Sequence, residues 1–265
     1  MIDDGVNEAT LRLVVTLIVF AVLASLELCL PRRPRPSPRS RRWPGNLFLQ
    51  VFNAVFVRAF FFWLVPVLIA FKAEALGIGL FNLVSLPGWF TMIVAIIALD
   101  LLVYWQHRLM HTFPWLWRLH RVHHADVDVD ASTALRFHPI EIVFSLALKS
   151  TAVTILGISA DAVLVFAILL NGMAMFNHAN IGLPIWLDKK LRVLLVTPDM
   201  HRVHHSVNAR EHNSNYGFSL SCWDRWFGSY QAQPEAGHKN MILGLNETNS
   251  QQTGSLVWML KNPFK

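Results

Sequence analysis

Long apolar runs constrain the fold of this chain more than any other feature of its sequence. The first covers about residues 11–30 (LRLVVTLIVFAVLASLELCL), and a helix needs about 20 apolar residues to cross the hydrocarbon layer of a membrane. Four further runs lie at about 47–71, 78–106, 141–158 and 162–177. A backbone surrounded by lipid must satisfy its own hydrogen bonds, which favours helices. The sequence therefore predicts an all-α, integral-membrane helical bundle.

The composition excludes several other classes of protein. Of the 265 residues, 54% are apolar and 15% are charged, whereas an average soluble domain has about 25% charged residues. A soluble two-domain enzyme and a disordered chain are inconsistent with these values. The two cysteines, Cys29 and Cys222, provide neither a disulfide framework nor a CxxC motif.

Local signals divide the first half of the chain into separate helices. We expect the run at 47–71 to form one span, with Arg58 facing the protein interior or reaching toward the interface. Pro87 and Gly88 separate a short re-entrant or interfacial piece from a long helix that begins at Trp89.

The second half of the chain reads as a helical hairpin followed by a cap. The runs at 141–158 and 162–177 are separated by a turn at 157–161. The chain from about 179 onward is more polar and contains tryptophan, so we expect a histidine-rich helical cap with amphipathic segments near the interface.

The positive charge of the chain is concentrated in one segment. Residues 31–46 (PRRPRPSPRSRRWPGN) contain six arginines and no acidic residue. A nucleic-acid-binding arm is one interpretation, but a basic loop directly after a span is typical of the cytoplasmic side, so we expect no nucleic-acid partner. The acidic start, MIDDGVNEAT, favours a retained span over a cleaved signal peptide. Counting crossings from this loop places the histidine motifs on the cytoplasmic face of an inner or plasma membrane.

Eight of the twelve histidines lie in three short motifs, one HxxxH and two HxxHH. On a helix, residues i, i+3 and i+4 share one face, so the imidazoles of each motif can reach one site. Neutral imidazole is the commonest metal ligand, and one ion needs about four ligands. The arithmetic predicts two metal ions, held by His107, His111, His120, His123, His124, His201, His204 and His205.

The remaining histidines receive separate interpretations. His178, in FNHAN, is a candidate for a ninth ligand. His138 lies just before the hairpin, where a structural hydrogen bond suits it better than a metal, although the sequence alone leaves both roles open. His212 and His238 lie in polar segments of the tail, and we expect neither to be a ligand.

Groups that support the imidazoles are also expected. Two divalent ions held by neutral rings leave about four positive charges to be offset, and acceptors for the imidazole N–H would orient the rings. Helix capping is the alternative for Asp126 and Asp199. The candidates are Asp100, Tyr104, Asp126, His138 and Asp199.

Six motifs follow one another between residues 89 and 230. They are HRLMH (107–111), HRVHH (120–124), RFHPIE (136–141), FNHAN (176–180), TPDMHRVHH (197–205) and NYGFSLSCWDRWFGSY (215–230). In this order they resemble the fatty acid hydroxylase/sterol desaturase superfamily of integral-membrane non-haem iron enzymes, and in particular its bacterial sterol desaturase-like branch. Carried over to this sequence, the resemblance implies that His178 joins the other eight histidines as a ligand.

The resemblance also implies the chemistry. Two iron ions, replaceable by zinc in purified protein, would use dioxygen to hydroxylate or desaturate a C–H bond of a sterol-like or fatty acyl lipid, in lipid biosynthesis. It further implies three parts: transmembrane segments with the basic loop (1–88), the catalytic domain (89–230) and a C-terminal tail (231–265).

The chain lacks an electron source of its own. It contains no haem-attachment motif, no cysteine set for an iron–sulfur cluster and no GxGxxG signature. We therefore expect two kinds of partner, a membrane lipid as substrate and a separate ferredoxin or small haem carrier that docks on the basic face.

Three alternatives compete with this interpretation. An acyl-lipid desaturase or an ether-lipid monooxygenase would use the same motifs. A metal transporter or store would place its ligands along the spans rather than at their ends. A zinc hydrolase would want a carboxylate inside its motif, as in HExxH, where this chain has Arg108, Arg121 and Arg202.

Overall fold

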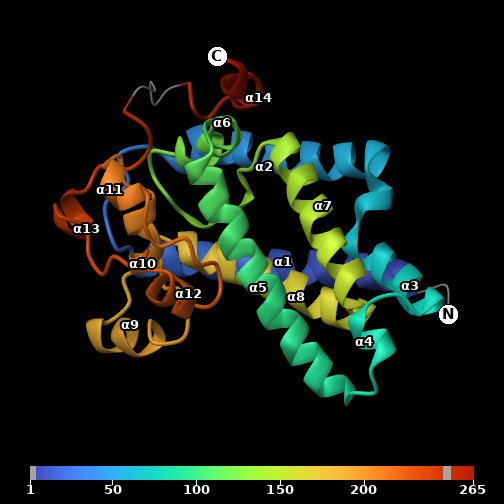
Figure 1. The fold of residues 1–265 in the computed structure, drawn as a ribbon. Helices are drawn as coiled ribbons and strands as arrows, with labels where there is room; N and C mark the ends of the chain where they lie inside the picture. Colours follow the sequence, from blue (N-terminus) through green and yellow to red (C-terminus); the bar gives the residue numbers. More distant parts are fainter. Residues whose placement is uncertain (1–3, 247–251) are drawn as a thin grey trace.

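The computed structural model of the protein describes residues 4–246 and 252–265 (Figure 1). Within these residues the chain is helical, and its only β-pairings are isolated bridges. The long helices are α1 (Asp4–Cys29), α2 (Arg39–Phe60), α5 (Gly88–Thr112), α7 (Pro139–Leu156) and α8 (Ala160–His178). This architecture confirms the predicted all-α class.

Shorter helical segments connect and cover the long ones. Between the long helices lie η1 (Phe62–Leu64), α3 (Pro66–Leu76), α4 (Leu80–Leu83), α6 (Pro114–His124) and η2 (Ala131–Leu135). After α8 come α9 (Ile185–Leu191), α10 (Pro198–His204), α11 (Ala209–His212), α12 (Cys222–Trp226), α13 (Gly237–Asn240), α14 (Leu256–Lys261) and η3 (Asn262–Phe264).

Five segments of the described chain are long and apolar enough to cross a membrane. They are Glu8–Cys29, Pro66–Leu83, Gly88–Thr112, Pro139–Leu156 and Ala160–His178. The protein is therefore an integral membrane protein. The helix expected from Trp89 and the hairpin of α7 and α8 are confirmed, and the hairpin turns at Gly157, whose φ of 66° suits glycine.

The single span expected at 47–71 is wrong. Helix α2 ends at Phe60, and α3 begins at Pro66 after a 3-10 turn. Proline has no N–H for a helical hydrogen bond and disfavours the helical conformation in the residue before it. Val65 is accordingly extended, with a ψ of 119°, and the chain changes direction there.

Helix α2 has a polar face toward the protein and an apolar face toward the outside. Arg42 and Asn46 are buried at 1% and 0% exposure, whereas Phe48 and Val51 are 63% and 60% exposed. This is the reverse of a helix on a soluble protein, and it is the pattern that contact with lipid favours. Arg58 is exposed in the last turn of this helix, so it does not face the protein interior.

Helix α8 lies at the centre of the bundle and packs against α1, α3, α5 and α10. Helices α9–α13 gather beyond the end where α8 finishes, on the left in Figure 1. We call this the cap end. The HxxHH motif of α6 meets that of α10 here, because their histidines belong to the same two groups of imidazoles.

Buried hydrogen bonds hold the cap end together. Glu27 of α1 is 0% exposed, and its carboxylate accepts hydrogen bonds from the backbone N–H groups of Ala131 and Asn180, at 2.8 and 3.0 Å. Arg39 donates to the same carboxylate at 2.7 Å. The end of α1, the start of η2 and the chain after α8 are thereby fixed relative to one another.

Candidate metal centre

Nine histidines converge inside the cap end. His107 and His111 come from α5, and His178 comes from the last turn of α8. The others lie on α6 (His120, His123, His124) and on α10 with the residue that follows it (His201, His204, His205). They are the eight histidines of the three motifs together with His178, brought together from four helices.

The nine imidazoles form two groups, and within each group the nitrogens that could bind a metal lie within 4.8 Å of one another. The first group contains His107, His111, His120, His124 and His204. The second contains His123, His178, His201 and His205. The two HxxHH motifs are therefore each divided between the groups.

Hydrogen bonds fix the orientation of several rings in the first group. The Nδ1 atoms of His107 and His204 donate to the carbonyl oxygens of Tyr216 and Ser214, at 2.8 and 2.7 Å. A carbonyl only accepts, so the proton is on Nδ1 and the lone pair is on Nε2. The Nε2 atoms of these rings are buried without a hydrogen-bond partner in the described structure.

The second group has the same character. The Nδ1 of His178 donates to the carbonyl of Ala174 at 2.6 Å. Its Nε2 then lies 3.0 Å from Nε2 of His123 and 3.1 Å from Nε2 of His201. Lone pairs that converge this closely are a poor arrangement on their own and a good one around a cation.

The electrostatics of the histidines also suit a metal. Burial, followed by the charges of neighbouring imidazoles, holds the pKa values of His123, His124, His201, His204 and His205 well below the usual range. The rings are consequently neutral at pH 7. Neutral imidazoles with buried, unpartnered nitrogens fit two metal ions, one in each group.

One residue of the centre is a carboxylate that the sequence interpretation did not single out. Glu141, at the start of α7, accepts a 2.7 Å hydrogen bond from Nδ1 of His120, and both side chains are buried. The sequence did contain a signal for this residue, namely an acidic residue at the beginning of an apolar span. A buried carboxylate in a span needs a specific partner.

Asp100 and Tyr104 of α5, which we expected to support the imidazoles, contact other groups instead. The carboxylate of Asp100 accepts hydrogen bonds from Trp223 Nε1 at 2.8 Å and from the backbone of residues 219–220. The hydroxyl of Tyr104 pairs with Ser229 at 2.9 Å. These contacts fasten α5 to α12 and its flanking loops rather than orienting an imidazole.

The other expected supporting residues also differ from the interpretation. Asp126 binds Arg42 at 2.6 Å, and this guanidinium holds the pKa of the carboxyl below its usual range against the effect of burial. Asp199 binds Arg32 at 2.9 Å and also Arg202. His138 caps α7, where its Nδ1 accepts from the N–H of Ile140 at 3.3 Å, so the structural role holds for it.

The last two histidines belong to neither group. His212 stacks on Trp117 with ring centroids 5.4 Å apart, and its centroid lies 5.9 Å from that of His111. His238 lies 3.5 Å from Asp199. Neither imidazole joins a group of residues that could hold a metal ion in the described part of the chain.

A cavity of about 450 Å³ leads from the histidines into the bundle. His107, His120 and Glu141 line one end of it. Apolar side chains such as Met175 and Phe218 line its walls, and the cavity extends between helices that cross the membrane. The cavity therefore connects the first histidine group with the space between these helices.

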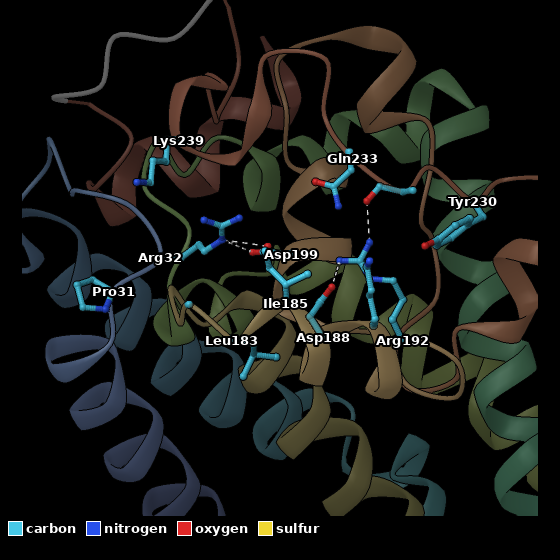
Figure 2. Close-up of a pocket in the computed structure, with 13 residues that line it drawn as sticks. Pro31, Arg32, Leu183, Ile185, Asp188, Arg192, Asp199, Tyr230, Gln233 and Lys239 are labelled. Carbon is cyan, nitrogen blue, oxygen red and sulfur yellow. Dashed lines mark hydrogen bonds and ion pairs between the residues drawn. The ribbon is translucent and has the colours of Figure 1, made fainter.

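A second pocket, of about 550 Å³, opens at the surface of the cap end. Arg32, Lys189, Arg192 and Lys239 surround it, and Figure 2 shows Arg32 turned toward Asp199 and Arg192 turned toward Asp188. The pocket combines exposed lysines with paired arginines, which gives a basic face beside α10.

The sequence comparisons agree with this site. The sequence model of the fatty acid hydroxylase family matches residues 92–229. Ornithine lipid hydroxylase OlsE of Rhizobium tropici is 29% identical over 148 residues, which are 56% of this chain and 44% of that protein. Alkylglycerol monooxygenase of Homo sapiens is 33% identical over 158 residues, 59% of this chain and 34% of that protein.

More distant relatives carry out a different named reaction. Very-long-chain aldehyde decarbonylase GL1-5 of Oryza sativa subsp. indica is 27% identical over 180 residues, 61% of this chain and 28% of that protein. The chain thus spans less than half the length of each of these relatives. No solved structure matches it. The family match extends over more than half of the chain and includes all nine converging histidines, and the protein therefore belongs to the fatty acid hydroxylase family, within the fatty acid hydroxylase/sterol desaturase superfamily.

Proposed function

We propose that the protein is a membrane oxidoreductase that uses dioxygen to hydroxylate a lipid. The observation that carries the proposal is the position of two buried histidine groups at the end of a cavity between membrane-spanning helices. The named activities of the relatives, an ornithine lipid hydroxylase and an alkylglycerol monooxygenase, support it. A transporter would instead place its ligands along the spans, whereas most of these histidines lie on α6 and α10, outside the membrane-spanning segments.

The first group of five histidines and the second group of four would each hold one iron ion. The pair supplies oxygen activation and removal of hydrogen from an unactivated C–H bond. Imidazole also suits zinc and copper, so the choice of iron rests on the family. We retain His107, His111, His120, His123, His124, His178, His201, His204 and His205 as the proposed ligands.

The residues around the ligands orient them and exclude water. Tyr216, Ser214 and Glu141 accept the Nδ1 protons of His107, His204 and His120, respectively, on the side away from the group, so that each Nε2 lone pair points inward. Phe218 lines the cavity beside the rings, with its centroid 5.4 Å from that of His107. An apolar wall protects a reactive site from water and from side reactions.

We assign the cap end to the cytoplasmic side of an inner or plasma membrane. The arginine-rich loop lies at this end, because Arg32 contacts Asp199 and Arg42 contacts Asp126. Basic loops are retained on the cytoplasmic side.

An acidic electron carrier, a ferredoxin or a small haem protein, would dock on the basic pocket of Figure 2. Insertion of one oxygen atom into a C–H bond, with the other released as water, consumes two electrons and two protons. Asp199 joins Arg32 of this pocket to Arg202 of α10, next to His201. Charge complementarity steers such encounters and makes them depend on salt. Turnover with NADH and no protein partner would contradict this assignment.

The function is tested by isotope incorporation. The iron-loaded full chain in bilayers of total membrane lipid is supplied with ferredoxin, its reductase, NADPH and ¹⁸O₂. We expect one lipid product that carries a single ¹⁸O atom, and no such product from a His123→Ala variant. Absence of label from the lipids while the protein retains its iron would refute the proposal. Label at the carbon next to an ether oxygen would identify the alternative, an ether-lipid monooxygenase.

A further inference from the structure

The cavity beside the histidines is not uniformly apolar. Helix α7 contributes Glu141, Ser145 and Lys149 to its lining, and α1 contributes Arg12. Both helices are membrane-spanning segments. Ionisable groups at such depth are costly, face the interior of the bundle and mark binding sites or relays. Polar and charged side chains thus lie at defined positions along the cavity, which indicates that it binds a partly polar molecule.

The three residues of α7 form one stripe. They are spaced by four residues, so they lie along one face of the helix, and all three line the cavity. Glu141 binds His120 of the first group, whereas Lys149 is eight residues further along α7. At 1.5 Å per residue, Lys149 lies about 12 Å from Glu141 along the helix axis. The acidic end of the stripe is at the histidines and the basic end is deep in the bundle.

The basic end contains a cation without a protein partner. Among the described residues, Lys149 has no hydrogen bond or ion pair, and it is half-buried with its exposure toward the cavity. Arg12 lines the same region and pairs only loosely with Glu8, at 3.6 Å. At this end of the cavity two cations are accompanied by one carboxylate, Glu8, because Glu141 lies at the opposite end. An anion at the basic end would supply a partner for Lys149.

The size of the cavity limits what enters. At about 30 Å³ for each water-sized group, 450 Å³ holds about fifteen such groups, which corresponds to one alkyl chain with a small end group. A phospholipid with two chains and a large head group does not fit as a whole. The part of a lipid that enters the cavity is therefore one chain with, at most, a small end group.

We propose that the substrate is a single-chain lipid with an acidic end group, a carboxylate or a phosphate, which binds Lys149 and Arg12 while the chain runs toward His107 and His120. This inference rests on the proposed oxidation of a lipid at the histidine centre and names the substrate class. Glu141 at the other end repels an anion, so the orientation is fixed. A distance of about 12 Å corresponds to about ten carbon atoms of an extended chain with bonds of about 1.5 Å.

The binding experiment uses the iron-loaded full chain in phosphatidylcholine nanodiscs without oxygen, so that no turnover occurs. The probes are palmitate, hexadecyl phosphate and hexadecanol, which share one chain length and differ in the end group. We expect Lys149→Met to weaken binding of an acidic probe by about 10–100-fold, as loss of a hydrogen bond to a charged group does. Lys149→Arg should retain it, and hexadecanol should bind equally to all three proteins.

The two acidic probes distinguish a carboxylate from a phosphate as the preferred end group. An unchanged affinity for both acidic probes in a folded Lys149→Met protein, or hexadecanol binding as tight as that of the acids, would overturn the inference. Thermal unfolding of each variant verifies that it is folded, and Lys72→Met, at an exposed position on α3, is the matched control.

A second measurement uses the oxidised position. With fatty acids of increasing length, a substrate anchored by its acid is oxidised at a constant distance from the carboxyl carbon. A constant distance from the methyl end would overturn the inference. If binding of palmitate or hexadecyl phosphate depends on Lys149 but no lipid is labelled in the ¹⁸O₂ experiment, the acid site stands and the proposed function fails, so the two failures are distinguishable.

Discussion

Nδ1 of His120 lies 2.7 Å from Oε1 of Glu141, and the two side chains are buried at 2% and 3% exposure. The carboxylate accepts the proton of the imidazole and leaves the Nε2 lone pair for the first histidine group. The same glutamate lines the cavity, so it connects the ligands to the space where a lipid would bind.

Removing this carboxylate should weaken metal binding at the first group. In Glu141→Leu, we expect iron affinity to fall by about 10–100-fold, because the orientation and basicity of His120 depend on the acceptor. Glu141→Gln, which retains an acceptor oxygen, should lose less. Titration of the apo protein with ferrous iron measures this, and Glu74→Gln, at an exposed position, is the control. Equal iron affinity in Glu141→Leu and the parent would contradict the role.

The two histidine groups predict separate metal losses. His123 belongs to the group of four and His204 to the group of five, so each alanine variant should lose one iron of two per chain and the double variant should lose both. Iron analysis of protein purified from iron-replete cells tests this, with His212→Asn as the control. Two iron ions per chain in both single variants would contradict the assignment of His123 and His204 as ligands.

The buried ion pair between Arg42 and Asp126 should be structural. Both side chains are almost fully buried, and the guanidinium also binds Asp130 at 2.9 Å. In Arg42→Met the two carboxylates remain buried without their cation, which costs about 3–5 kcal/mol. We expect the unfolding temperature in detergent to fall by about 10 °C. The neighbouring exposed Arg41→Met should change it little, and similar unfolding temperatures for the two variants would count against the buried network.

Stability should decline with acid through His238. Burial lowers the pKa of this imidazole to about 4, while its unfolded value is about 6.5. The unfolded chain therefore binds more protons below pH 6.5, so the stability from neutral His238 is complete above that pH and is lost as pH falls toward 4. In His238→Asn, the fall in unfolding temperature between pH 7 and pH 5 should be smaller by about 3 °C or more. Parallel curves for the two proteins would show that His238 does not contribute.

The local histidine pattern was sufficient to identify the ligand candidates, but it did not define the two groups. His120, His123 and His124 share a helix, and their spacing predicted a common site. In the fold, His123 faces α8 and α10 and stacks on Phe137, whereas His120 and His124 face α5. Adjacent residues point about 100° apart on a helix, so the neighbours of α6 decide which imidazole joins which ion.

Proximity in sequence misled the interpretation of the acidic residues. Asp126 and Asp199 lie two residues from a histidine, yet their carboxylates bind arginines 84 and 167 residues away. Glu141, which does bind an imidazole, is 21 residues from its partner. Hydrogen bonds between side chains depend on distances that arise only when the helices pack.

The sequence by itself determined four of the five membrane-spanning segments, the candidate metal-binding residue types and the family, because apolar length and i, i+3, i+4 spacing act within one helix. The tertiary structure decided the division of nine histidines into groups of five and four, and the meeting of Lys149 with Arg12 in one cavity. These features arise from contacts between distant helices, and neither composition nor spacing specifies which helix faces meet.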